Sequence, residues 1–214
     1  MSKHDYQYVP MSKAKPVWNE LVEILHEVQN LVRQEFTFHF TPIGSYKRNM
    51  VTYDMKSNIG FDFDVNIEVN DREEAFRPDE IRRIIRNAIN RVAPHYGYGY
   101  CEDSTSVLTI KKVNNFQSRI IHSCDIAIVY ECSDGRQQYI RFNKNSNNYT
   151  WEYRGKGFDG FSERWDWLIH NGHKDDLLEY YIKKKNDSND PNKHSRSLLA
   201  ESVKELCDKF GYYR

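Results

Sequence analysis

Asp62 and Asp64 are the residues of this sequence whose types and spacing first suggest chemistry. They alternate with apolar residues over 61–65, so in an extended strand both carboxylates leave the same face. Two carboxylates on one face can share a divalent cation, because hard cations bind oxygen ligands. The alternation continues to residue 70, however, and an ordinary exposed polar strand face has the same pattern.

A third carboxylate, Asp125, lies in a second predicted strand over residues 119–131. Its same-face neighbours, Ser123, Ala127 and Val129, are not those of an open surface, so a carboxylate among them needs a partner. Three carboxylates on two adjacent strands could hold two Mg²⁺ or Mn²⁺ ions about 4 Å apart, which clamp the attacking and leaving oxygens of a phosphoryl transfer. We therefore expect the three aspartates to bind metal.

A glycine turn precedes both strands. Gly44 and Ser45 follow an aromatic strand predicted over residues 36–43, and Lys47 and Arg48 come directly after them. Glycine permits close approach of the backbone, and exposed N–H groups at such a turn can hold phosphate. We expect these four residues to bind a nucleotide, although a plain turn would use the same residue types.

In combination, these elements resemble the polymerase-β-like nucleotidyltransferase superfamily. The superfamily pattern appears here as Ile43-Gly44-Ser45, Phe61-Asp62-Phe63-Asp64-Val65 and Asp125. The segment 44–49 is most similar to the form found in bacterial cGAS/DncV-like nucleotidyltransferases and their oligoadenylate-synthase relatives, with Asn49 where glycine is usual. Asparagine tolerates a left-handed backbone better than most residues do. The spacer from Ser45 to Asp62 is somewhat longer than the pattern has.

The resemblance implies both a fold and an activity. The fold would be α+β, with a mixed sheet flanked by helices, a catalytic core over residues 15–155 and a short C-terminal helical segment over 156–214. The enzyme would use Mg²⁺ or Mn²⁺ to transfer a nucleoside monophosphate from an NTP to an acceptor hydroxyl, releasing pyrophosphate. It could thereby make cyclic or linear oligonucleotide signals. The acceptor stays open between a nucleotide, an RNA end, a small molecule and a protein hydroxyl.

The resemblance also implies a role for each matching residue. Ser45 and the backbone around Gly44 would hold the NTP phosphates, and Asp62 and Asp64 would bind the metals. Asp125 would complete metal binding and activate the acceptor hydroxyl. A catalytically silent module that binds nucleotide or RNA is the alternative, and a two-metal nuclease is a third reading that would not need the Gly-Ser turn.

The remaining periodicity predicts the elements that position these residues. Apolar spacing indicates a helix over 16–35 that opens at Pro16, and a second helix after Pro78 that ends near Val92. Beyond residue 160 the pattern is helical, interrupted by a polar linker over 183–194. Alternation predicts strands in a mixed or antiparallel sheet, over residues 36–43, 61–70, 106–113, 119–131, 138–142 and 149–153.

Composition excludes several classes of function. Lys plus Arg and Asp plus Glu both total 31, so no overall field attracts nucleic acid or an anionic membrane. The four cysteines lack CxxC spacing, which favours free thiols in a reducing compartment over a disulfide framework. Because no apolar run approaches the length of a bilayer crossing, we expect a cytoplasmic protein with no membrane partner.

Three further groups of residues could have either a structural or a functional role. His122 and Cys124 share a strand face and could bind zinc, but buried neutral side chains are the favoured interpretation. Arg82 and its neighbours on the second helix could contact phosphate, but a solvated helix face is favoured. The tryptophans and tyrosines over 149–167 could stack on a base, but aromatic residues more often close a core.

Overall fold

The two longest strands, β4 (Phe61–Asn70) and β7 (Arg119–Glu131), are parallel neighbours at the centre of a mixed sheet in the computed structural model. The structure describes residues 3–71, 75–155, 157–188, 190 and 193–212. The other strands of this sheet all pair antiparallel, in the order β2-β4-β7-β6-β5 with β8 on β7 and β9 on β8. They are β2 (Thr37–Ile43), β5 (Glu102–Asp103), β6 (Leu108–Asn114), β8 (Gln137–Asn143) and β9 (Asn148–Tyr153).

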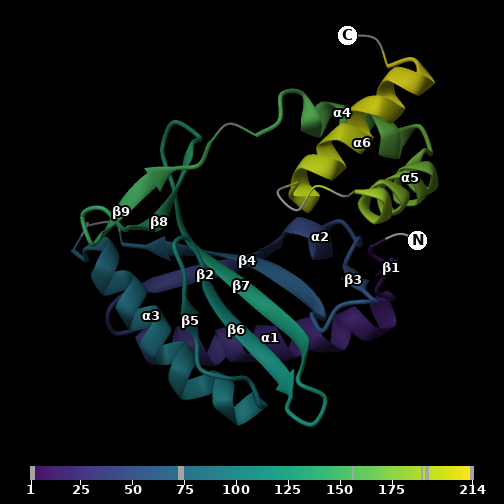
Figure 1. The fold of residues 1–214 in the computed structure, drawn as a ribbon. Helices are drawn as coiled ribbons and strands as arrows, with labels where there is room; N and C mark the ends of the chain where they lie inside the picture. The colour runs from purple at the N-terminus through teal and green to yellow at the C-terminus, as the bar shows by residue number, and fades with distance from the viewer. Residues whose placement is uncertain (1–2, 72–74, 156, 189, 191–192, 213–214) are drawn as a thin grey trace. The chain divides into compact units, whose positions relative to one another are not determined.

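The chain divides into two units, which are described separately. The sheet unit comprises Val9–Thr52 and Asn58–Arg154, and the helical unit comprises Met1–Tyr8, Tyr53–Ser57 and Gly155–Arg214. The sheet unit has the predicted α+β character, with a mixed sheet covered by helices on one face (Figure 1). Within the described ranges, no helix combines the length and apolar character needed to span a bilayer.

Two helices, α1 (Met11–Val32) and α3 (Pro78–Val92), cover the apolar face of the sheet in Figure 1. A short 3₁₀ turn, η1 (Ala93–Tyr96), extends α3. The period-two alternation of β4 sends its apolar residues to this face, where Phe63, Val65 and Ile67 have no exposed surface. The helix stripes complete the core with Leu21, Ile24, Leu25, Val28, Ile81, Ile85 and Ile89.

The start of α1 differs from the prediction. The helix begins at Met11 after Pro10, so Pro16 lies inside it and not at its first position. Ala14 is fully buried, which gives this extra turn a packing role. Packing of that turn outweighs the single backbone hydrogen bond that a proline near the helix start removes.

Arg82 on α3 is a second correction, because the predicted solvated arginine is 1% exposed. Its Nε donates to Asp103 Oδ1 (2.8 Å), and its other nitrogens donate to the carbonyl oxygens of Ser104 (2.6 Å), Val107 (3.0 Å) and Ile140 (3.2 Å). A buried guanidinium is tolerated only when it is paired and its donors are satisfied. Arg82 therefore ties α3 to the loops around β5, β6 and β8.

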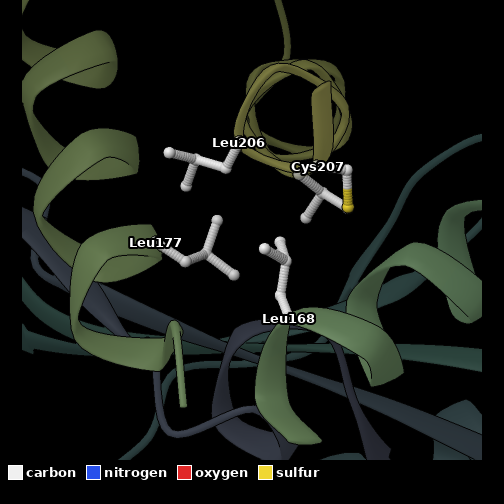
Figure 2. Close-up of a cluster of buried hydrophobic side chains, with 5 residues drawn as sticks. Leu168, Leu177, Leu206 and Cys207 are labelled. Carbon is white, nitrogen blue, oxygen red and sulfur yellow. The ribbon is translucent and has the colours of Figure 1, made fainter. Parts of the chain in front are cut away.

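The helical unit contains α4 (Phe161–His170), α5 (Lys174–Asp187) and α6 (Ser195–Phe210). Their buried side chains converge on one apolar cluster, drawn in Figure 2, of Leu168, Leu177, Val203, Leu206 and Cys207. Trp165 and Trp167 pack against this cluster, as expected of aromatic residues that close a core. The short strands β1 (Tyr6–Tyr8) and β3 (Thr52–Asp54) pair with each other.

The predicted polar linker over 183–194 begins later than expected. Helix α5 continues to Asp187. Tyr181 and Lys185 are buried on one side of it, so the helix still packs after its last aliphatic residue. Residues 189, 191 and 192 of the predicted linker lie outside the described residues.

Candidate active site

The register of β4 and β7 brings the predicted carboxylates to one face of the sheet. In this parallel pair Asp64 lies beside Asp125, and Asp62 lies beside Ser123. Residues paired in register point to the same side, so all three carboxylates leave the face opposite α1 and α3. We call this the carboxylate face.

One register row crosses five strands on the carboxylate face and contains Asp64 and Asp125. It runs Ile43, Asp64, Asp125, Thr109, Glu102 from β2 to β5. Within it, the Thr109 hydroxyl donates a 2.6 Å hydrogen bond to Asp125 Oδ1. Thr109 was not among the predicted site residues, since only strand pairing places it beside Asp125.

Gly44 packs directly against Asp64. It follows the end of β2 with a φ of +63°, the left-handed region that favours glycine. A Cβ at this position would collide with Asp64 Oδ2 and would lie 3.1 Å from the carboxyl carbon. The positive φ therefore favours glycine here, and any larger residue would also displace the Asp64 carboxylate.

The predicted glycine turn after β2 is a single helical turn, α2 (Gly44–Lys47). The N–H groups of Arg48 and Met50 donate to the Ser45 carbonyl (3.2 and 2.9 Å), which closes the turn. Arg48 Nη1 donates to the Gly44 carbonyl at 3.0 Å, and Lys47 is exposed. The four predicted nucleotide-binding residues therefore lie together in one short segment.

Two other residues fix this segment in place. Asn49 has a φ of 57°, so the expected left-handed asparagine is confirmed. The Tyr46 ring stacks on Trp18 of α1, with centroids 5.0 Å apart, and lies 5.1 Å from the Phe63 ring of β4. Helix α2 is consequently anchored both to α1 and to the strand that carries Asp62 and Asp64.

Asp64 has the most perturbed carboxyl environment of the site. Burial, together with the neighbouring negative charges of Asp62 and Asp125, raises its pKa to about 6. The Arg154 guanidinium acts in the opposite direction and lowers this pKa. A carboxylate held among like charges at some cost is typical of a functional site.

Arg154 and Asn66 were missed by the sequence analysis. Arg154 Nη2 donates to Asn66 Oδ1 at 2.9 Å, and Asn66 lies two residues beyond Asp64 on the same face of β4. Asn66 is 8% exposed, whereas Arg154 is exposed. The two residues are 88 positions apart, so no local pattern could have linked them.

The chemistry of the three carboxylates fits a divalent cation. They supply hard oxygen ligands, and Mg²⁺ or Mn²⁺ would neutralise the negative charges that, together with burial, raise the pKa of Asp64. Among the described residues, no three His, Cys, Asp or Glu side chains are already close enough to hold a metal ion.

His122 and Cys124, the possible zinc ligands, point to the opposite, helix-covered face and are buried there. His122 Nε2 is 2.8 Å from the Tyr98 hydroxyl, and within the described chain its buried Nδ1 has no hydrogen-bond partner. Burial, with the nearby charge of Lys112, lowers the pKa of His122 to about 4. The interpretation as buried neutral side chains is confirmed.

Comparison with known proteins identifies the fold. No protein-family model and no curated protein sequence matches this chain. Vibrio cholerae DncV in a 3'-deoxy ATP bound form is 17% identical, with a TM-score of 0.58 over 87% of this chain and 50% of that one. Escherichia coli CdnC with ATP is 12% identical, with a TM-score of 0.53 over 94% of this chain and 62% of that one.

A further structure shows V. cholerae DncV, described as a cyclic AMP-GMP synthase, with the linear intermediate pppA(3',5')pG. It is 15% identical, with a TM-score of 0.51 over 87% of this chain and 52% of that one. The chain thus spans about half the length of the DncV structures. At these identities the likeness establishes the fold, which is the polymerase-β-like nucleotidyltransferase fold seen in these cGAS/DncV-like enzymes.

Proposed function

We propose that this chain is a nucleotidyltransferase that moves a nucleoside monophosphate from an NTP to an acceptor hydroxyl and releases pyrophosphate. The observation that carries the proposal is the pairing of Asp64 with Asp125 across β4 and β7, with Gly44 packed against Asp64. A fold shared with NTP-bound nucleotidyltransferases supports it. The turn that we propose to hold phosphate then packs against one of the carboxylates that we propose to hold the metal.

The candidate residues would have three roles: metal binding, phosphate binding and proton acceptance. Asp62, Asp64 and Asp125 would hold Mg²⁺ or Mn²⁺, which when bound neutralises the triphosphate and the charge on the attacking and leaving oxygens. Gly44 N–H and the Ser45 hydroxyl would hold phosphate oxygens. Asp125, oriented by the Thr109 hydroxyl, would accept the proton of the acceptor hydroxyl in the in-line attack on the α-phosphorus.

A second nucleotide is the acceptor we propose, so that the product would be a cyclic or linear oligonucleotide. The support is the name of the V. cholerae neighbour, a cyclic AMP-GMP synthase with a linear intermediate. An RNA end, a small molecule or a protein hydroxyl would give a different product from the same chemistry.

The test is to incubate the full chain with each labelled NTP, with Mg²⁺, Mn²⁺ or a chelator, and to separate the products. Pyrophosphate and an oligonucleotide without added acceptor would support the proposal, and Asp64→Asn should abolish both. Glu68→Gln is the matched control, since Glu68 lies on the same strand face but pairs with His39 (2.8 Å). Shortened nucleic acid would instead indicate a nuclease, and NTP binding without turnover would indicate a silent module.

The phosphate role of Ser45 has its own test. Ser45→Ala should leave the fold intact and weaken NTP binding by roughly tenfold, the scale of one lost hydrogen bond to a charged group. Calorimetric titration with an NTP under metal conditions that prevent turnover measures it. Unchanged affinity would remove Ser45 from the binding site.

A further inference from the structure

Arg154 is a cation on the carboxylate face that the proposed reaction does not yet use. Its guanidinium is held 2.9 Å from Asn66 Oδ1, in the register row next to that of Asp64 and Asp125. We propose that Arg154, positioned by Asn66, binds a phosphate group of a substrate nucleotide. This inference rests on the proposed function and adds a specific phosphate contact to it.

The local packing directs the guanidinium toward this site. Asn66 pairs in register with Ala127 of β7, so the strand beside Asn66 presents only a methyl group. The Arg154 N–H donates to the Gln137 carbonyl at 2.9 Å, which fixes its backbone at the end of β9. Because the Arg154 backbone is fixed and its guanidinium is already bonded to the buried Asn66 amide, this side chain loses little conformational entropy when it binds a ligand.

The charge of Arg154 also acts on the carboxylate face. It lowers the pKa of Asp64, and the guanidinium that carries it contacts the amide of Asn66 at 2.9 Å. A guanidinium is planar and presents paired N–H donors, a geometry that matches the oxygens of a phosphate.

The phosphate has two possible sources, the triphosphate of the donor and the phosphate of a nucleotide acceptor. They can be separated by titrating the full chain with two probes under Mg²⁺, inorganic tripolyphosphate and AMP. Neither probe is a nucleoside triphosphate, so no nucleoside monophosphate can be transferred and binding is measured without turnover. A failure of the catalytic proposal would therefore leave this result interpretable.

Arg154→Gln should weaken one of the two probes by about ten- to a hundredfold, the range for a lost hydrogen bond to a charged group. Weaker tripolyphosphate binding assigns Arg154 to the donor, and weaker AMP binding assigns it to the acceptor. Arg83→Gln, which removes one exposed positive charge from α3, is the matched control and should change neither affinity. Equal affinities in wild type and Arg154→Gln, or no binding of either probe by wild type, would overturn the inference.

The positioning role of Asn66 is tested by a double-mutant cycle. Asn66→Ala should weaken the same probe by a smaller factor, and adding it to Arg154→Gln should cause no further loss, because the two changes remove one contact. The thermal midpoint separates this from a structural role, in which Arg154 only joins β9 to β4. A midpoint that falls in Arg154→Gln while both probe affinities stay at the wild-type value would establish the structural role instead.

Discussion

The sheet unit contains two charged side chains that are largely removed from water, Arg82 and Asp64, and their surroundings differ in charge. Around Arg82, one carboxylate and three carbonyl oxygens surround the guanidinium. Around Asp64, burial and the charges of Asp62 and Asp125 raise the pKa to about 6, and the charge of Arg154 offsets only part of this rise. The charge of Arg82 is compensated and joins elements together, whereas that of Asp64 is held at a cost, as expected where charge placement serves binding or catalysis.

The two faces of the central strands repeat this contrast. On the helix-covered face, β4 presents Phe63, Val65 and Ile67, which have no exposed surface. On the carboxylate face the same strand presents Asp62 and Asp64 beside Asp125. Substitutions on the two faces should therefore divide cleanly into those that change stability and those that change chemistry.

The largest expected effect is on turnover and comes from Asp125→Asn. Asparagine fills the same space and its Oδ1 can still accept the hydrogen bond from Thr109, but it cannot take a proton and binds a cation weakly. Turnover at saturating Mg²⁺ and NTP should fall by about a hundred- to ten-thousandfold. The thermal midpoint in metal-free buffer should stay level or rise, because one repelling charge is gone. A large drop in midpoint with turnover per folded molecule preserved would make Asp125 a structural residue.

Arg82→Met should have the opposite profile. Removing the guanidinium takes the Arg82 donor from three carbonyl oxygens and from Asp103, which keeps only Arg86 and Tyr149 as the donors described here, and this should lower the free energy of unfolding by about 3–5 kcal/mol. Urea titration measures the loss, and turnover per folded molecule should change little. Arg83→Met, on the exposed side of the same helix, is the control and should lie within about 0.5 kcal/mol of wild type.

The pH dependence of stability provides a third test of the contrast. Because the pKa of Asp64 rises from 3.8 to about 6 on folding, the folded protein binds more protons than the unfolded chain in that window. Stability in metal-free buffer should therefore fall as pH rises from about 4 to 6, and the penalty should be constant above that, at about 3 kcal/mol.

Asp64→Asn should remove this penalty. The variant should be more stable than wild type at pH 8 and nearly equal to it at pH 4, with Glu68→Gln as the control on the same strand face. Adding Mg²⁺ at pH 8 should stabilise wild type and not Asp64→Asn. If wild type and Asp64→Asn showed the same pH profile, the pKa of Asp64 could not be raised by burial and repulsion as proposed.

Much of the fold could be predicted because its signals are local. The alternation of residues gives both ends of β4 and of β7 as the structure has them, and it assigns Asp62 and Asp64 to one side. Asparagine tolerates a left-handed backbone, which is the conformation that Asn49 has. These properties depend on neighbours within a few positions, which a sequence displays directly.

The errors and omissions concern long-range pairing. Arg82 looks like a solvated helix residue because Ile140, whose carbonyl it contacts, is 58 positions away. Thr109 and Asp125 become partners only when β6 joins β7 in one register, and Arg154 reaches Asn66 only after the β8–β9 hairpin forms. A one-residue shift of either register would separate these pairs, and the sequence does not specify register at that accuracy.

The smallest predicted effect is that of Thr109→Val, which removes only the hydroxyl bonded to Asp125 Oδ1 at 2.6 Å. Valine keeps the β-branched shape favoured in β6, so the fold should persist. Without the hydrogen bond Asp125 samples other rotamers, and kcat should fall about tenfold while the NTP KM stays constant, because only the orientation of the base changes. Thr109→Ser, which restores a hydroxyl, should recover most of the activity. Thr150→Val, which removes a similar bond to Glu152 (3.0 Å) in β9, is the control and should leave kcat unchanged. If Thr109→Val and Thr150→Val lowered kcat equally, the bond to Asp125 would contribute nothing specific to the reaction.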